Sequence, residues 1–322
     1  MPSSVGWTGR LECVAAARSL IGTNAHLKKA GSAVGPVSLT AAASIWGGMY
    51  VVTKSLFATV PPWVLLDLRY WLALVPLGAV ALIRRAWGIG WADLPGLALS
   101  ALVGYVGSVG MQFWGTAYAG AALGSLITAA SPALITVLSP VLLGERLTGR
   151  AFFAVVVATS GVVFAAGFPG VQARGAETLW GSALLFGAAV SWALYTLLAR
   201  RLTRRRSSLT VTLWVTLFGA LFTLPLGLGE WHGSLAHTLV TPPVVAGVLF
   251  VAWCSTAIAF FLWNFGFEHV PASVGSLFFF AQPVVGGLLG WLVLGERLSW
   301  AFGAGGALIA FAVWLSTRRA PA

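Results

Sequence analysis

Few side chains in this sequence could bind or position a small molecule, and most of them interrupt long apolar segments. They are aromatic or neutral-polar: Trp46, Tyr50, Tyr105, Gln112, Ser131, Trp192, Tyr195, Asn264 and Gln282. Side chains of these types stack on a ligand and exchange neutral hydrogen bonds with it. Singly each could instead join one apolar helix to another. Together they predict an aromatic, neutral-polar binding cavity.

A second group of residues is charged or kinks a helix, and could gate a pathway or anchor a helix: Lys54, Arg69, Pro132, Pro283, Glu145, Arg146, Glu296 and Arg297. Charges within a membrane span are functional candidates by default. For Arg69 the residues favour helix-to-helix anchoring, and for Lys54 both roles stay open. The two prolines fall near the middle of their segments, where a kink exposes polar backbone to a cavity.

The two Glu-Arg dipeptides call for separate treatment because adjacent residues on a helix do not face each other. Any ion pair that Glu145 or Glu296 forms must therefore reach another helix. The alternative, which we favour, is that each dipeptide ends a helix and anchors it at the headgroups, since exposed pairs contribute little.

The sequence contains no motif for catalysis, for a cofactor or for a metal. No nucleophile elbow, HExxH, CxxC or Walker A loop stands out. Cys13 and Cys254 lie far apart, and no metal-ligating residues accompany His232 or His237. No carboxylate lies clearly at the middle of an apolar segment, so proton coupling has no support. We therefore expect neither an enzyme nor a bound cofactor.

Composition identifies the class of protein that positions these residues. Of the 322 residues, 58% are hydrophobic and 8% are charged, whereas soluble domains carry about 25% charged residues. The chain therefore cannot cover a water-facing surface. Its net charge of +11 comes from short basic clusters between apolar runs, which is typical of membrane orientation rather than nucleic-acid binding.

About 20 apolar residues are needed for a helix to cross a bilayer. That length predicts ten spans, at residues 37–57, 63–83, 94–116, 119–142, 150–168, 179–199, 209–229, 242–266, 270–294 and 299–317. With the N-terminus inside, fifteen Lys and Arg residues lie on the cytoplasmic side and two outside. This asymmetry predicts a multi-pass inner-membrane protein with both termini in the cytoplasm. Residues 1–36 form a cytoplasmic N-terminal tail, a candidate for disorder.

An internal repeat organises the ten spans. Residues 120–147 aligned on 271–298, an offset of 151, match at twelve of 28 positions, including Gly-Glu-Arg-Leu in both segments. Trp46 precedes Lys54 by eight residues, as Trp192 precedes Arg200. Residues 37–168 and 179–317 are therefore two five-helix repeats. Because five is odd, the second repeat is inverted, an architecture of secondary transporters with binding sites near the midplane.

The chain resembles the EamA-like family of the drug/metabolite transporter superfamily over residues 37–317. The residues that carry the resemblance are Trp46, Lys54, Arg69, Pro132, Glu145 and Arg146 in the first half, and Trp192, Pro283, Glu296 and Arg297 in the second. It implies ten helices around a central cavity and transport of small metabolites, often by export. It does not name a substrate.

These observations predict a secondary transporter that exports or exchanges a small neutral or zwitterionic metabolite, with amino acids as candidates. One alternative is a carrier of phosphorylated or nucleotide-linked sugars, which would require several cavity-facing cations beyond Lys54 and Arg69. The other is a non-transport membrane protein, which would not explain the inverted duplication. The expected partners are a small-molecule substrate and the lipid bilayer, with no nucleic acid. The oligomeric state stays open, and a monomer is compatible with the sequence.

Overall fold

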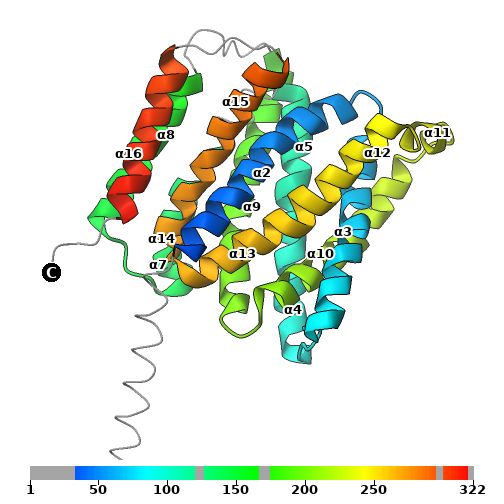
Figure 1. The fold of residues 1–322 in the computed structure, drawn as a ribbon, viewed down its shortest axis with the longest axis horizontal. Coiled ribbons are helices and arrows are strands. Elements are labelled where there is room, and N and C mark those ends of the chain that lie inside the picture. The colour runs from blue at the N-terminus through cyan, green and yellow to red at the C-terminus, as the bar shows by residue number, and fades with distance from the viewer. Residues whose placement is uncertain (1–32, 120–126, 167–174, 295–299, 318–322) are drawn as a thin grey trace, which may run out of the picture.

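Helices connected by short turns make up the described part of this chain, because apolar segments in a bilayer must satisfy their backbone hydrogen bonds internally. The computed structural model describes residues 33–119, 127–166, 175–294 and 300–317 (Figure 1). These residues contain helices and no strand, so the predicted all-α class is confirmed. Most of the predicted tail, residues 1–36, lies outside the described part, and the first described helix begins at Val34.

The first half of the chain supplies the elements that precede residue 167. In chain order they are α2 (Val34–Leu56), α3 (Pro62–Arg84), η1 (Trp91–Asp93), α4 (Leu94–Ser100), η2 (Ala101–Ser108), α5 (Val109–Ala119), α7 (Ser131–Leu143) and α8 (Gly149–Ala166). Pro62 stands at the start of α3, where its missing N–H leaves no helical hydrogen bond unmade. Gly144 ends α7 in the left-handed conformation, with φ of 66°.

The second half begins with the longest helix of the described residues. Its elements are α9 (Gly175–Thr203), α10 (Ser208–Gly229), α11 (Leu235–Leu239), α12 (Pro242–Leu249), η3 (Phe250–Ile258), α13 (Ala259–His269), α14 (Ala272–Gly275), η4 (Ser276–Phe280), α15 (Ala281–Leu294) and α16 (Trp300–Thr317). The Ser207 side chain accepts a hydrogen bond from the Thr210 N–H and caps α10, as serine does at many helix starts.

Five described helical stretches are long and apolar enough to cross a membrane. They are Pro62–Arg84, Trp91–Tyr118, Leu179–Thr203, Ser208–Gly229 and Pro242–His269. Shorter apolar helices occupy Ser131–Leu143, Gly149–Gly161, Ala272–Gly286 and Gly303–Ala312. These five stretches indicate a multi-pass membrane protein. The prediction of ten spans stays a prediction.

Four of the long apolar segments change their helical form near the middle. The central parts of the third and eighth predicted spans, η2 and η3, are π-helical. In the fourth span a turn at residues 129–130 precedes α7, and in the ninth the 3₁₀ helix η4 precedes α15. Because π-helical segments are rare and concentrate at functional sites, their equivalent placement in both halves directs attention to this level of the molecule.

Pro132 and Pro283 each stand directly after a change of helical form. Pro132 is the second residue of α7, after the turn at residues 129–130, and Pro283 is the third residue of α15, after the 3₁₀ helix η4. A proline has no N–H for a helical hydrogen bond, and its ring crowds the preceding turn. That these prolines kink their segments beside a cavity stays a prediction.

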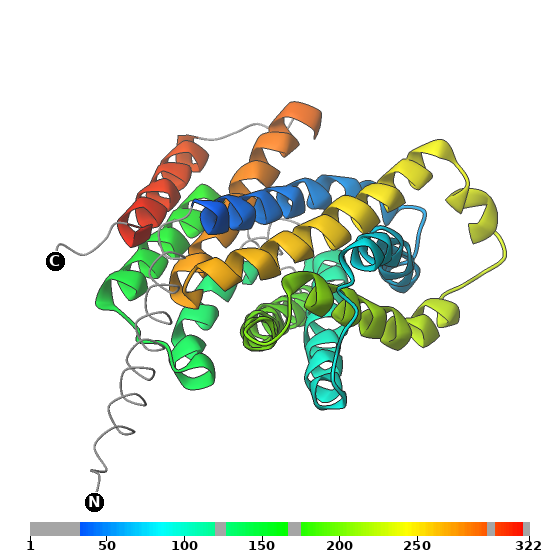
Figure 2. The ribbon, with the colours of Figure 1, turned by 60° about the horizontal axis from the view of Figure 1, so that its bottom comes forward.

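Helices of the two halves pair with one another throughout (Figures 1 and 2). α3 packs against α10, α8 against α16, α2 against α13 and α15, and α9 against α5 and α7. α3 and α10 are antiparallel, because the Trp63 N–H at the start of α3 donates to the Glu230 carboxylate just after α10. Figure 1 also shows α8 and α16 running in opposite directions. Each pairing in one half thus has a counterpart in the other.

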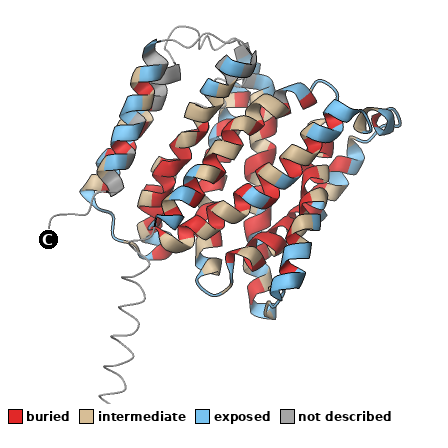
Figure 3. Ribbon diagram, viewed as in Figure 1, coloured by how far each residue is buried: buried red, intermediate tan, exposed pale blue. Residues whose placement is uncertain are grey.

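Burial separates the interior of this bundle from a largely apolar outside (Figure 3). The largest fully buried side chains include Trp263, Arg69, Tyr70, Tyr105 and Tyr195. Large apolar side chains such as Ile83 and Val141 are about 80% exposed, at 79% and 81%. An exposed apolar surface of this extent is what lipid tails would cover.

Gly47 sets the contact distance between α2 and α15, and this predicts an asymmetric result for two adjacent substitutions. A Cβ at Gly47 would lie 2.6 Å from the Gln282 carbonyl oxygen, whereas one at Gly48 would meet a Leu289 methyl at 3.4 Å. We expect Gly47→Ala to destabilise the fold by about 1–3 kcal/mol through overpacking. Gly48→Ala should change stability little. Unfolding of the purified protein in detergent measures both, and equal midpoints would contradict this packing.

Candidate functional site

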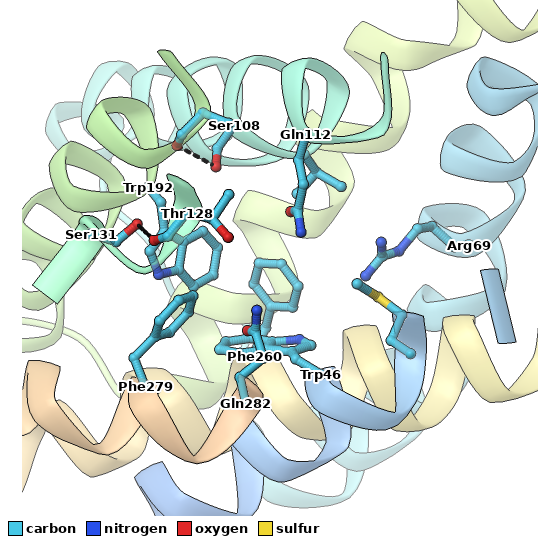
Figure 4. Close-up of a pocket in the computed structure, with 13 residues that line it drawn as sticks. Trp46, Arg69, Ser108, Gln112, Thr128, Ser131, Trp192, Phe260, Phe279 and Gln282 are labelled. Atoms are coloured by element: carbon cyan, nitrogen blue, oxygen red, sulfur yellow. Dashed lines mark hydrogen bonds between the residues drawn. The ribbon is translucent and has the colours of Figure 1, made fainter. Parts of the chain in front are cut away.

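A cavity lies at the level of the helix breaks and is lined by both halves of the chain (Figure 4). In the conformation described here the free space inside it is small, about 30 Å³. The first half contributes Trp46, Met49, Arg69, Ser108, Val109, Gln112, Thr128 and Ser131, and the second half Ala188, Trp192, Phe260, Phe279 and Gln282. Aromatic rings and neutral amides dominate this lining. Because each half supplies part of it, relative motion of the halves would open or close the cavity.

A cluster of aromatic rings forms one wall of the cavity. The rings of Trp46 and Trp192 meet edge to face, with centroids 5.0 Å apart, and Phe260 lies 5.4 Å from the first and 5.6 Å from the second. The Trp46 indole N–H donates to the Ser255 carbonyl at 2.9 Å. The Trp192 indole N–H is buried and has no hydrogen-bond partner. The wall therefore offers apolar ring faces and one free donor.

Two amides from different halves meet at a single phenol. The Nε2 groups of Gln112 and Gln282 both donate to the Tyr50 hydroxyl, the second at 3.2 Å. The amide oxygens of these glutamines can still accept hydrogen bonds from a ligand, whereas the Tyr50 hydroxyl is also hydrogen-bonded to the Thr128 side chain. This arrangement gives the cavity neutral hydrogen-bond donors and acceptors, which can bind a ligand without a change in charge.

Arg69 brings the positive charge into the cavity lining. Its side chain is 1% exposed. Its Nε donates to the Thr256 hydroxyl at 2.8 Å, and Nη2 reaches Ser255 at 3.5 Å. Nη1 is buried without a hydrogen-bond partner. Among the described residues no carboxylate lies within ion-pair distance of the Arg69 guanidinium, since the two ion pairs found there belong to Arg200 and Arg206.

Beyond the aromatic wall, polar side chains form a packed layer rather than a part of the cavity. Tyr195 and Asn264 exchange hydrogen bonds at 3.1 and 3.3 Å, and Asn264 also donates to the Thr212 hydroxyl at 3.0 Å. The Tyr105 hydroxyl accepts from Thr216 at 3.4 Å. Tyr105 and Tyr195 are fully buried. Tyr195 follows Trp192 by three residues on α9, so this layer lies between the cavity and the end of α9.

An ion pair joins the halves at that same end. The Glu145 carboxylate binds the Arg200 guanidinium at 2.8 Å and accepts the Ala272 backbone N–H at 2.9 Å. Glu145 follows α7, Arg200 lies on α9, and Ala272 begins α14. Arg200 stands eight residues from Trp192, which is about 12 Å along the helix axis. The contact therefore ties first-half and second-half elements about two turns from the cavity.

Two comparisons decide the family. A model of the EamA-like transporter family matches residues 34–167 and, a second time, residues 179–318. The chain belongs to the EamA-like transporter family. The EamA-like chain is thus an internal duplication, and the family consists of membrane transporters. Within the family, Uncharacterized transporter YetK of Bacillus subtilis is 30% identical over 287 residues, which is 84% of each chain.

Further comparisons agree on the family and on the fold. An uncharacterized transporter of Archaeoglobus fulgidus is 24% identical over 285 residues, covering 88% of this chain and 98% of its own. A solved crystal structure superposes with a TM-score of 0.73 at 23% identity, over 88% of this chain and 96% of that one. The helical arrangement is therefore one that an experimental structure shares.

The EamA-like chain places the predicted binding residues in two groups. The first group lines the cavity or contacts its amides: Trp46, Tyr50, Gln112, Ser131, Trp192 and Gln282. The second group lies in the packed layer beside it: Tyr105, Tyr195 and Asn264. The Ser131 hydroxyl donates to the Thr128 carbonyl at 2.7 Å. That these residues bind a substrate stays a prediction.

The predicted gating or anchoring residues differ in their contacts and in whether the structure describes them. Glu145 forms its ion pair with Arg200 of another helix rather than with its neighbour Arg146. The Arg146 side chain is exposed. Arg69 anchors α3 to η3 through Thr256 and also lines the cavity. The backbone of Lys54 belongs to the end of α2, but its side chain lies outside the described part. Glu296 and Arg297 lie outside the described residues as well.

Sequence reasoning missed Met49, Val109, Thr128, Ala188, Phe260 and Phe279 as lining residues. The repeat contained a signal for several of them. With the offset of 151, Val109 corresponds to Phe260 and Thr128 to Phe279, just as Ser131 corresponds to Gln282. Applying the offset to the position one turn before Ser131 would have found the missed pair Thr128 and Phe279.

The ion pair between Glu145 and Arg200 predicts measurable coupling between the halves. Both side chains are 14% exposed, and removing one partner would leave the other poorly compensated. We expect Glu145→Gln and Arg200→Gln each to lower stability by about 1–3 kcal/mol, and the double variant to cost clearly less than their sum.

The matched control is the pair between Asp93 and Arg206, whose arginine is 35% exposed. A double-mutant cycle on this pair should give weaker coupling because water screens it. Unfolding in detergent measures both cycles. Additive effects at Glu145 and Arg200 would show that their contact does not hold the halves together.

Proposed function

We propose that this EamA-like protein is a secondary carrier that exports or exchanges a small neutral or zwitterionic metabolite, with amino acids as candidates. The observation that carries the proposal is a cavity lined by both halves of a duplicated chain, which is small in the conformation described here. Such a site at a repeat interface is typical of carriers that work by alternating access. Each half would rock against the other and present the cavity to one side at a time.

The proposed architecture is ten spans in two inverted five-helix repeats. Support comes from the pairing of equivalent helices, since α3 and α10 occupy second place in their halves and are antiparallel. The two π-helical segments and the two helix breaks also recur at equivalent positions. Together with the asymmetry of Lys and Arg, this predicts an inner-membrane location with both termini in the cytoplasm.

The proposed mechanism assigns a role to the contacts at the end of α9. The Glu145 carboxylate holds Arg200 and the start of α14, and the layer of Tyr195 and Asn264 lies between this ion pair and the cavity. In the conformation described here these contacts close one exit. Opening that exit requires them to separate, so they are candidates for a gate on this side of the membrane.

Uptake into proteoliposomes tests the proposed function. The panel contains aromatic and aliphatic amino acids, nucleosides, polyamines and a sugar phosphate, each with and without a pH gradient. We expect saturable uptake of one neutral or zwitterionic class, and a gradient effect would reveal proton coupling. Saturable uptake of the sugar phosphate alone would favour the alternative carrier. No uptake of any compound, while a reference carrier works in parallel vesicles, would contradict the proposal.

Trp192 offers a sharper test of the cavity within this assay. Trp192→Ala removes a ring that packs on Trp46 and Phe279, and we expect uptake efficiency to fall about tenfold or more, because stacking and orientation are lost. Trp192→Phe should retain part of the activity. The control is Trp180→Ala on the same helix, since Trp180 is 61% exposed. Unchanged uptake by a folded Trp192→Ala protein would contradict a role of Trp192 in substrate binding.

A further inference from the structure

Arg69 is a buried cation whose charge has no counter-charge among the residues described. It lies in the middle of α3, and arginine keeps its charge inside proteins. Its hydrogen-bond partners are two neutral residues, Thr256 and Ser255. A buried charge without an opposite charge is costly, the more so inside a membrane span. The energetic argument therefore favours an anion that arrives with the ligand.

The geometry of the guanidinium leaves one edge free for such an anion. Nε is bound at 2.8 Å, Nη2 makes contacts of 3.5 Å at the limit of a hydrogen bond, and Nη1 has no partner. Figure 4 shows the guanidinium directed from α3 into the space between Gln112 and Trp46. An arginine edge with two such nitrogens matches the two oxygens of a carboxylate.

We propose that the free edge of Arg69 binds the carboxylate of the transported molecule, so that the substrates are small monocarboxylates with an apolar or aromatic body. This deepens the proposed carrier function and rests on it. An amino acid meets the requirement, as does a simple organic acid. A fully neutral metabolite does not, because it would leave Arg69 without an opposite charge.

The charge balance favours a carboxylate over a phosphate ester. Among the described lining residues Arg69 supplies the positive charge, and the remaining polar groups are neutral. A carboxylate brings one negative charge, whereas a phosphate monoester brings about 1.5 to 2 at neutral pH. A phosphate would therefore stay undercompensated in this cavity. The rings of Trp46, Trp192, Phe260 and Phe279 provide the surface for the rest of the molecule.

Matched acid and amide probes test the proposal on the purified full chain. Binding is measured for L-phenylalanine against L-phenylalaninamide, phenylacetate against phenylacetamide, and phenyl phosphate as the dianion. We expect the wild type to bind each acid about 10- to 100-fold more tightly than its amide, because a charge-assisted hydrogen bond is lost. Arg69→Gln should reduce this ratio to about one, and Arg69→Lys should keep part of it.

The controls separate charge recognition from folding. Arg84→Gln alters an exposed arginine on the same helix and should keep the wild-type ratio. Thr256→Val removes the hydrogen bond that orients Nε and keeps the cation, so it should lower the acid preference less than Arg69→Gln does. An Arg69→Gln protein that is folded and retains the preference would overturn the proposal, and so would equal binding of acids and amides by the wild type.

Proteoliposome uptake of the same probes distinguishes failure of the carboxylate assignment from failure of the carrier function. Saturable transport of the amides without preference for acids overturns the carboxylate assignment and leaves the carrier function intact. Transport that is specific for acids and lost in Arg69→Gln supports both. Absence of saturable uptake for every compound of the wider panel overturns the carrier function itself, and the carboxylate assignment falls with it.

Discussion

The hydrogen bonds that satisfy interrupted backbone are the constraint on which this structure depends. In a bilayer a carbonyl freed from its helix has no water to bind, and the π-helical segments η2 and η3 free such groups. Side chains from neighbouring helices occupy them: the Tyr70 hydroxyl donates to the Tyr105 carbonyl and the Trp46 indole to the Ser255 carbonyl. Within η3 itself, the Thr256 hydroxyl donates to the Val251 carbonyl five residues earlier.

This constraint explains why the cavity and the helix breaks coincide. The side chains that donate to these carbonyls must be polar and must point inward. Trp46 and Arg69 both donate to the Ser255 carbonyl and therefore lie at the centre of the bundle. Arg69 binds the Thr256 hydroxyl, which in turn binds the Val251 carbonyl, and the guanidinium is thereby fixed with one edge unused. Helix anchoring and the proposed binding of a carboxylate are compatible at Arg69, because Nε serves the first and Nη1 is left for the second.

The sequence predicted what depends on composition and periodic pattern. Apolar length indicated helices near the observed positions, and the repeated Gly-Glu-Arg-Leu revealed the duplication that the family match shows directly. It also selected Gln112 and Gln282, because amide side chains are few in these apolar runs, and Trp46, because a tryptophan near the centre of a span lies away from the membrane interface. It could not reveal the π-helical segments, since η2 and η3 contain no proline and no other residue that marks the change in hydrogen bonding.

The depth of a residue in a span does not determine the direction in which its side chain points. Tyr105, Tyr195 and Asn264 lie on the helices that sequence reasoning chose, but their partners are one another's hydroxyl and amide groups and two threonines. A polar side chain in a membrane helix can bind either a neighbouring helix or a ligand. A shift of one residue along the helix turns the side chain to a different face and so changes its partner. For Glu145 the same limit holds: its partner Arg200 is 55 residues away in the sequence, and the fold alone brings them together.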